Sequence, residues 1–86
     1  MYKYLLSTEN EEQLFYDACL AIESLYPQAI KRPLLMDVDN SLVQTYTLEG
    51  RDIDVYNNYV LGSVYIKSEI DIDDIFRKYR NDKAYI

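Results

Sequence analysis

Residues 42–67, LVQTYTLEGRDIDVYNNYVLGSVYIK, decide the fold because they contain three successive β-strand patterns. The first strand is predicted over residues 42–48, a run rich in β-branched and aromatic side chains. Residues 52–56 alternate between polar and apolar side chains, with Ile53 and Val55 facing inward. We therefore expect three neighbouring strands, with residues 59–67 as the third.

Turn signals separate these strands and join them to a fourth. Residues 49–51 contain a glycine, and Asn57-Asn58 is predicted to be a two-residue hairpin turn because asparagine tolerates positive φ. Upstream, residues 34–39 alternate as a half-buried strand and end in a turn at residues 39–41. Gly62 is expected to mark a β-bulge. Since short turns join antiparallel strands, the sequence predicts a four-stranded antiparallel meander.

An N-terminal strand and a long helix precede the meander. The strand is predicted over residues 2–6 and the helix over residues 9–26, where Pro27 ends it. Thr8 is the expected N-cap, and Glu11 completes a capping box with it. The side chains expected to be buried recur at helical spacing: Leu14, Ala18, Ala21, Ile22 and Leu25.

A short second helix is predicted after the meander. Either Ser68 or Asp71 caps it, and its apolar stripe consists of Ile72, Ile75, Phe76 and Tyr79. The element order is then β-α-β-β-β-β-α, in one acidic α+β domain that spans residues 1–86. Helix is expected to cover the sheet face that carries Leu34, Met36, Val38, Leu42, Tyr46, Leu48, Ile53, Val55, Val64 and Ile66.

The chain has a net charge of −6 over 86 residues, and this charge is unevenly distributed. Between Glu9 and Asp74, 14 acidic and 4 basic residues give a local net charge of −10. A negative surface repels nucleic-acid phosphates and anionic lipids, so we expect neither direct nucleic-acid binding nor membrane binding. Such a surface favours basic partners and increases the rate of association with them.

The composition argues against an enzyme. The chain has no histidine, the commonest general base near neutral pH, and its two glycines cannot form a phosphate-binding loop. Cys19 is the only cysteine and is expected to be a small buried residue.

No disulfide can form within the chain and no apolar run reaches the ~18 residues of a membrane span, so we expect a cytoplasmic protein. No catalytic residue and no cofactor is predicted. Tyrosine, which is enriched in binding surfaces, occurs ten times.

Residues 34–42, LLMDVDNSL, resemble motif I of the haloacid dehalogenase-like phosphatases, in which an Asp-x-Asp pair follows an apolar strand. The resemblance implies Asp37 as nucleophile, Asp39 as general acid/base, and a magnesium ion between the carboxylates and the substrate. Lys67 and Asp73-Asp74 follow in the family's order. That family's fold needs a parallel sheet, in which each crossover takes a dozen or more residues. Because the 44 residues after the motif are predicted to form hairpins, we do not predict phosphatase activity.

The same stretch also resembles an EF-hand calcium loop. That loop needs a glycine at its sixth place and a glutamate at its twelfth, where this chain has Leu42 and Leu48. Both departures remove what the loop needs to bind calcium. We therefore predict no metal site.

Two pairs of acidic side chains dominate the predicted partner-binding surface. If Val38 points inward, Asp37 and Asp39 face solvent, and the same alternation exposes Asp52 and Asp54. In the predicted meander the two pairs flank the strand between them, about 10 Å apart at ~4.8 Å per strand step. Residues expected to share that face are Thr45, Thr47, Tyr56 and Tyr65. The predicted partner-binding residues are Asp37, Asp39, Asp52, Asp54, Tyr56 and Tyr65.

Rows of carboxylates can engage the arginine and lysine side chains of a basic groove as phosphates do, which is how a protein mimics DNA or RNA. We therefore expect a non-enzymatic inhibitor that occupies a basic, often nucleic-acid-binding, site on a partner protein. Phage and mobile-element counter-defence proteins, including anti-CRISPR proteins, are commonly of this size and charge. The same physics would serve an immunity protein or antitoxin that blocks a toxin, and the sequence does not separate the two. A structural domain that forms a homodimer through a β-edge is a third interpretation.

Overall fold

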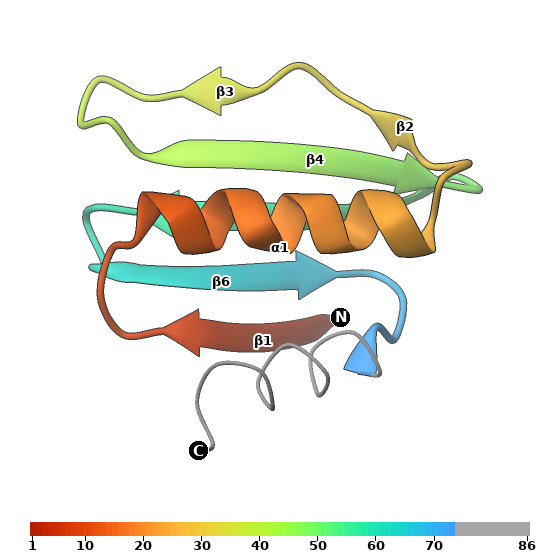
Figure 1. Ribbon diagram of the computed structural model, residues 1–86, viewed down its shortest axis with the longest axis horizontal. Helices are drawn as coiled ribbons and strands as arrows, with labels where there is room; N and C mark the ends of the chain where they lie inside the picture. Colours follow the sequence, from red (N-terminus) through yellow and green to blue (C-terminus); the bar gives the residue numbers. More distant parts are fainter. Residues whose placement is uncertain (74–86) are drawn as a thin grey trace.

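The computed structural model describes residues 1–73, which form one α-helix and an antiparallel β-sheet (Figure 1). The fold is therefore α+β. The helix, α1, spans Glu12–Leu25 and follows the N-terminal strand β1, Tyr2–Ser7. The other strands are β2 (Ile30–Lys31), β3 (Leu35–Met36), β4 (Leu42–Leu48), β5 (Arg51–Asn58) and β6 (Ser63–Ser68).

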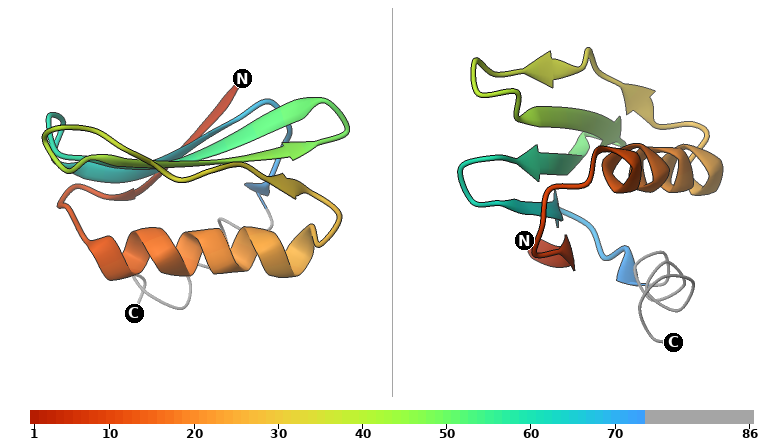
Figure 2. Two further views of the ribbon diagram at one scale, coloured as in Figure 1. Left: turned by 90° about the horizontal axis from the view of Figure 1, so that it is seen from above. Right: turned by 60° about the vertical axis from the view of Figure 1, so that its left-hand side comes forward.

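The strand order in the sheet is β1-β6-β5-β4-β2, and β3 also pairs with β4. Every pairing is antiparallel, which agrees with the predicted meander from β3 to β6 although the strand boundaries differ. β1 lies beside β6, and the short strand β2 was not predicted. Figure 2 shows α1 lying across one face of the sheet. We call the opposite face, which no described helix covers, the open face.

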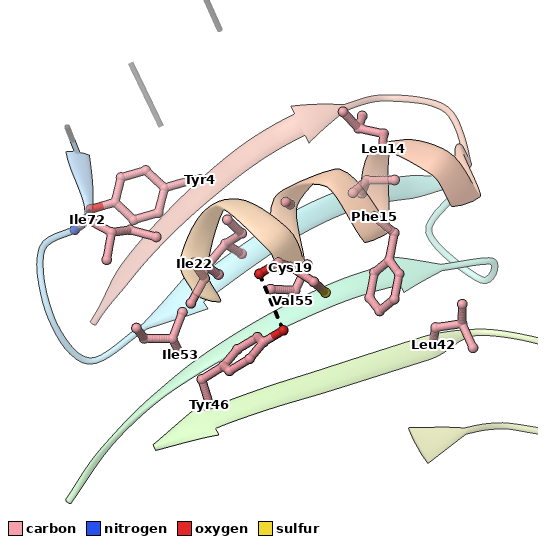
Figure 3. Close-up of a cluster of buried hydrophobic side chains, with 13 residues drawn as sticks. Tyr4, Leu14, Phe15, Cys19, Ile22, Leu42, Tyr46, Ile53, Val55 and Ile72 are labelled. Carbon is pink, nitrogen blue, oxygen red and sulfur yellow. Dashed lines mark hydrogen bonds between the residues drawn. The ribbon is translucent and has the colours of Figure 1, made fainter. Parts of the chain in front are cut away.

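The hydrophobic core lies between α1 and the sheet (Figure 3). Phe15 and Ile22 of α1 are fully buried, and so are Ile53 and Val55 of β5. Burial of apolar surface contributes about 25 cal/mol per Å², so this layer supplies most of the stabilisation of the fold. The predicted inward positions that the structure confirms are Leu42, Tyr46, Ile53, Val55, Val64 and Ile66.

The strand predicted over residues 34–39 is mostly wrong, because only Leu35–Met36 pair with β4. Its expected inward side chains are exposed: Leu34 is 40%, Met36 is 65% and Val38 is 100% exposed. In Figure 2, α1 lies over the central strands and does not extend over β3. An alternating pattern at this edge therefore has no second layer to pack against.

The hairpin turn predicted at Asn57-Asn58 is also wrong, because β5 continues through both residues. The turn comprises residues 59–62, and Gly62, with φ of 69°, is its last residue and not a bulge. Asn57 is fully buried, and its Oδ1 accepts a hydrogen bond of 2.8 Å from Nδ2 of Asn10. The irregularity in the sheet lies between Leu5 and Ser7 of β1.

α1 begins later than predicted, and Thr8 is not its N-cap. Glu11 is the N-cap residue and makes no side-chain capping hydrogen bond. Ser7 takes part in the local contacts instead, since its Oγ accepts the N–H of Glu9 and donates to the Glu11 carboxylate, both at 3.0 Å. The helix ends two residues before Pro27, close to the prediction. Its buried stripe is Leu14, Phe15, Ala18, Cys19 and Ile22, and Leu25 is exposed.

Only the start of the predicted second helix falls within the described residues. Asp71 Oδ1 accepts the N–H of Asp73 at 2.8 Å, the contact expected of an N-cap aspartate. The hydroxyl of Tyr4 accepts the N–H of Ile72 and donates to Asp71, both at 3.1 Å, which attaches this segment to β1. The remainder of the predicted stripe lies outside the described residues: Ile75, Phe76 and Tyr79.

α1, with 14 residues, is shorter than the ~20 residues that cross a lipid bilayer. No other helix in residues 1–73 could serve as a membrane span.

The β4–β5 turn gives a stability prediction. Leu48 pairs with Arg51, so Glu49 and Gly50 form a two-residue turn in which both have positive φ, 52° and 79°. This conformation favours Asn-Gly. We expect Glu49→Asn to raise the free energy of unfolding by about 0.5–1 kcal/mol in urea titrations. Glu49→Ala is the control, and an asparagine variant no more stable than the alanine variant would contradict the assignment.

Candidate protein-binding surface

The turn after β3, residues 37–41, is stabilised by its own side chains. The N–H of Asp37 donates to Ser41 O at 2.9 Å, and the N–H of Asn40 donates to Asp37 O at 3.0 Å. Asp37 Oδ1 accepts the N–H of Val38 at 2.7 Å, and Asp39 Oδ1 accepts the N–H of Ser41 at 3.0 Å. These bonds fix both carboxylates on the turn and leave the Val38 side chain fully in solvent.

The β5–β6 loop, residues 59–62, is organised by Asn58. Its Oδ1 accepts the N–H groups of Val60 and Leu61 at 2.9 and 3.0 Å, and its Nδ2 donates to the Tyr65 hydroxyl at 3.1 Å. The N–H of Gly62 donates to Asn58 O at 2.8 Å. One strand residue therefore holds the loop so that Val60 and Leu61 project outward, 81% and 63% exposed.

A hydrogen bond of 2.8 Å from the N–H of Tyr59 to Ser41 Oγ joins this loop to the turn after β3. Beside it is a hollow of about 470 Å³, which we call the end hollow. Val43 and Tyr56 lie opposite each other on β4 and β5 and contribute to its lining. The other lining residues are Leu35, Met36, Asp37, Asp39, Ser41, Leu42, Asn58 and Val60.

Large apolar side chains are exposed on the turn, on the loop and on β3. We call them the apolar rim, and they are Leu35, Met36, Val38, Val60 and Leu61, with exposed fractions from 62% to 100%. Scattered apolar residues on a surface need no explanation, but a contiguous group beside a hollow commonly marks an interaction site. Leu35, Met36 and Val60 of the apolar rim also line the end hollow, so the rim is a candidate surface for burial against another macromolecule.

Two carboxylates give this end of the sheet a negative charge. Hydrogen bonds from the backbone and side chain of Ser41 lower the pKa of Asp39, so that carboxyl is ionised at neutral pH. None of the described residues that line the end hollow is basic. Over residues 1–73, 13 acidic and 5 basic residues give a net charge of −8. A basic group is therefore the favoured occupant of this site.

The four predicted aspartates do not form two facing rows. Because Met36 pairs with Leu42, Asp37 and Asp39 lie beyond the start of β4. Thr45 faces Asp54 and Thr47 faces Asp52, three and five residues further along β4, or roughly 10 and 17 Å at ~3.4 Å per residue. The predicted spacing of about 10 Å across the strand is therefore wrong.

Asp52 and Asp54 do lie on the open face, as predicted, but each has polar neighbours from this chain. Thr47 Oγ1 donates to Asp52 Oδ1 at 2.8 Å and accepts a hydrogen bond of 3.2 Å from Nε of Arg32. Asp54 lies directly opposite Lys67 of β6. This part of the open face is thus less available to a basic partner than the end hollow.

Tyr65 was predicted to contact a partner, but only 4% of it is exposed. Its ring stacks on Tyr56 with centroids 4.7 Å apart, and Lys3 Nζ lies 4.9 Å from the Tyr65 centroid. Tyr56 is half-buried, and burial, followed by the nearby Asp54 carboxylate, raises the pKa of its hydroxyl. Tyr65 therefore packs beside Tyr56 from the neighbouring strand and offers little surface to a partner.

Of the six predicted residues, the structure brings together Asp37, Asp39 and Tyr56 at the end hollow. The sequence analysis missed the apolar rim, because β3 was expected to face a core and residues 59–61 were expected to lie within a strand. A usable signal was present in Val60-Leu61-Gly62, since a glycine commonly closes a turn.

The structure places Cys19 in the core, 5% exposed, and burial raises the pKa of its thiol to about 11. Because the thiolate is the reactive form, we expect a thiol reagent at pH 8 to label the native protein far more slowly than the urea-unfolded protein. Equal labelling rates for the folded and unfolded protein would contradict this burial.

Within residues 1–73, no group of three or more His, Cys, Asp or Glu side chains is placed so that it could hold a metal ion.

Comparison of the chain with protein-family models, with curated proteins and with solved structures finds no match in any of the three.

Proposed function

We propose that this chain is a non-enzymatic protein-binding inhibitor that applies the end hollow and the apolar rim to a basic surface of a partner protein. The observation that carries this proposal is that three exposed apolar side chains, Leu35, Met36 and Val60, line one hollow together with two carboxylates. The exposed Val38 and Leu61 are their neighbours on the turn and the loop. Burying them against a partner would remove apolar surface from water at about 25 cal/mol per Å².

The arrangement of the site supports binding to a protein more than binding to a small molecule. Protein interfaces combine apolar and polar contacts, and the apolar rim with Asp37 and Asp39 offers both. The turn and the loop are each fixed by several internal hydrogen bonds and are joined through Ser41. A site that is already ordered loses little conformational entropy on binding.

The charge supports a basic partner. A net charge of −8 over residues 1–73 attracts a cationic surface and accelerates association with it. Proteins that block nucleic-acid-binding sites, such as phage counter-defence and anti-CRISPR proteins, need this complementarity, and immunity proteins and antitoxins need it as well. The four aspartates do not form rows, so our proposal does not require that the carboxylates imitate the spacing of nucleic-acid phosphates. It rests on the end hollow and the apolar rim, which combine negative charge with exposed apolar side chains.

The test is affinity capture from the lysate of the natural host at low salt, with the immobilised full chain. The informative variant is Val38→Ser with Val60→Ser, which removes the two most exposed members of the apolar rim. The matched control is Leu20→Ser with Leu25→Ser, which changes two side chains on α1 that are 59% and 53% exposed. Both variants should fold, because neither removes a core residue.

We expect the rim variant to lose the captured protein, the α1 variant to retain it, and capture by the unmodified chain to weaken as salt rises. Equal capture by the rim variant and the unmodified chain would overturn the proposed site. If the unmodified chain binds only its own copies, measured by sedimentation, then the inhibitor proposal is replaced by the homodimer interpretation.

A further inference from the structure

We infer that the end hollow accepts an arginine side chain of the partner, with its guanidinium group against the Tyr56 ring and beside the Asp37 and Asp39 carboxylates. This inference rests on the proposed function and names the chemistry of the partner's anchoring residue. Its basis is that an aromatic ring, two carboxylates and apolar side chains line one hollow.

Tyr56 offers a ring that is held in place before binding. It stacks on Tyr65 at 4.7 Å with an interplanar angle of 14°, and the Tyr65 hydroxyl accepts a hydrogen bond from Asn58. A ring fixed in this way loses little side-chain entropy when a ligand packs on it. Tyr56 can therefore serve as a rigid wall of the end hollow.

The same pair of tyrosines already lies beside cations of this chain. Lys3 Nζ is 4.9 Å from the Tyr65 centroid, and Lys67 Nζ is 5.7 Å from the Tyr56 centroid. Both distances are within the range of cation–π attraction. Lys67 lies opposite Asp54 in the register of β5 and β6. None of the described residues that line the end hollow is basic, so a cation from a partner meets no like charge in its lining.

The hollow suits arginine better than lysine. A guanidinium group is planar, stacks on aromatic rings, and binds a carboxylate through two parallel hydrogen bonds, whereas a lysine ammonium is a compact and strongly hydrated point charge. The methylene groups of the arginine stem would pack along Leu35, Val43 and Val60, which also line the hollow. A purely apolar anchor would remove water from Asp37 and Asp39 without replacing its hydrogen bonds.

The test titrates the full chain at low salt with blocked amino-acid amides of arginine, lysine and citrulline, observed by backbone amide NMR shifts. We expect the arginine amide to shift residues 37–41 and 56–62, to bind about fivefold more tightly than the lysine amide, and the uncharged citrulline amide to cause no shift. Signals of α1, on the other face of the sheet, should not move.

Variants test the named contacts. We expect Tyr56→Leu, and Asp37→Asn with Asp39→Asn, each to weaken binding of the arginine amide about tenfold. Tyr56→Phe keeps the ring, and Asp52→Asn lies away from the hollow, so both should bind as the unmodified chain does. The NMR spectrum of each variant verifies that it is folded.

Equal binding of arginine and lysine amides would overturn the arginine inference while leaving the proposed function in place. Absence of any shift at the hollow, or binding unaffected by Tyr56→Leu, would also overturn it. The proposed function is judged separately, by whether the Val38→Ser with Val60→Ser variant loses the captured protein.

Discussion

Replacing Phe15 with alanine is expected to lower the free energy of unfolding by about 3–5 kcal/mol. Phe15 is fully buried and points from α1 toward the sheet in Figure 3. Its truncation removes the apolar surface of an aromatic ring and leaves a cavity that the neighbouring strands can fill only partly. Because domains of this size are stable by about 5–15 kcal/mol at most, a large share of the stability would be lost.

Urea unfolding at neutral pH, followed by circular dichroism, measures this effect. The matched control is Leu20→Ala, also on α1, where the side chain is 59% exposed and we expect a change within about 0.5 kcal/mol. If the two variants were equally stable, Phe15 would not occupy the centre of the core and the rotation of α1 on the sheet would be wrong.

Phe15 also illustrates how far the sequence predicts this helix. The length and end of α1 follow from local signals, including Pro27 and the 3.6-residue period. Two apolar stripes fit that period, however, one containing Ala21 and Leu25 and the other Phe15 and Cys19. The choice between them depends on how the helix is rotated against the sheet, which is a tertiary property that no local pattern contains.

The strands show the same division between local and long-range causes. The alternation around Tyr46 and Ile53 predicts β4 and β5 correctly, because both strands have a core to face. Asn57 has a strong local preference for turns, yet it is buried in β5 and bonded to Asn10, 47 residues earlier. At Asn57 the local preference for a turn is therefore overridden, and the residue lies in a strand where its side chain bonds to the distant Asn10.

The candidate site was partly predictable for the same reason. The acidic residues Asp37 and Asp39 were identified from the period-two pattern, but that pattern assigned Val38 to the core. The strand actually ends at Met36, and hydrogen bonds within the turn then decide where each side chain points. After a strand ends, the alternation of polar and apolar residues in the sequence no longer indicates which side chains are buried. The exposed Val38 of the apolar rim lies in the turn that follows the end of β3.

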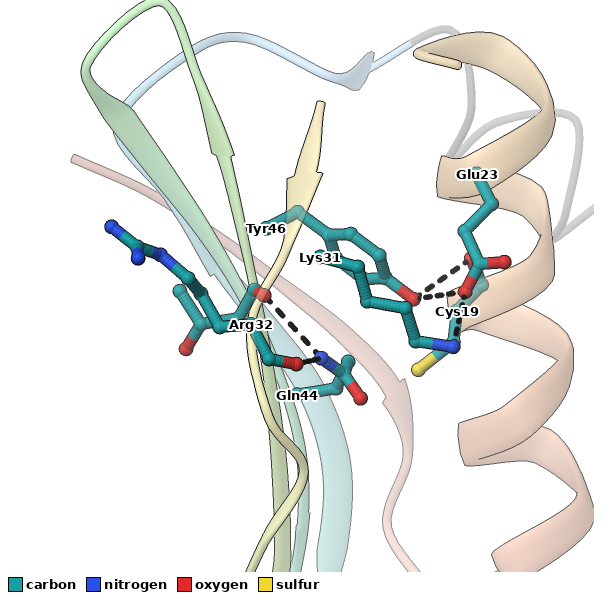
Figure 4. Close-up of polar contacts among 7 residues, drawn as sticks. Cys19, Glu23, Lys31, Arg32, Gln44 and Tyr46 are labelled. Atoms are coloured by element: carbon teal, nitrogen blue, oxygen red, sulfur yellow. Dashed lines mark hydrogen bonds and ion pairs between the residues drawn. The ribbon is translucent and has the colours of Figure 1, made fainter. Parts of the chain in front are cut away.

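The second large effect is expected at the contact between α1 and β4, where the Tyr46 hydroxyl donates to Glu23 Oε2 at 2.5 Å (Figure 4). Lys31 Nζ lies 3.1 Å from the same oxygen and joins β2 to the pair. Tyr46 is 1% exposed, so a phenylalanine ring at this position stays in the core and only the hydroxyl contacts are lost. We expect Tyr46→Phe to destabilise the protein by about 1–2 kcal/mol, because a hydrogen bond to a charged carboxylate is removed. The loss is not larger because the Glu23 side chain is 34% exposed, so water can hydrate the carboxylate in the variant.

This loss should depend on pH. The hydrogen bond from Tyr46, with further help from Lys31, lowers the pKa of Glu23 below its ordinary value. A carboxyl whose pKa is lower in the folded state contributes stability above its unfolded pKa of about 4.3, and this contribution is lost as pH falls through the folded pKa. The difference in unfolding free energy between the unmodified chain and Tyr46→Phe should therefore be largest near pH 7 and shrink toward pH 3.

Urea titrations at both pH values measure this difference, and Lys31→Met separates the two partners of Glu23. Lys31 is 57% exposed, so its ion pair is screened by water and its loss should cost less than about 1 kcal/mol. A Tyr46→Phe effect that is equal at pH 3 and pH 7 would mean that the hydroxyl stabilises this corner of the fold through other contacts, such as its 3.4 Å contact with Cys19 O, and not through a bond to an ionised Glu23. An effect of Lys31→Met larger than that of Tyr46→Phe would reverse the assigned order, in which the buried hydroxyl matters more than the exposed ammonium group.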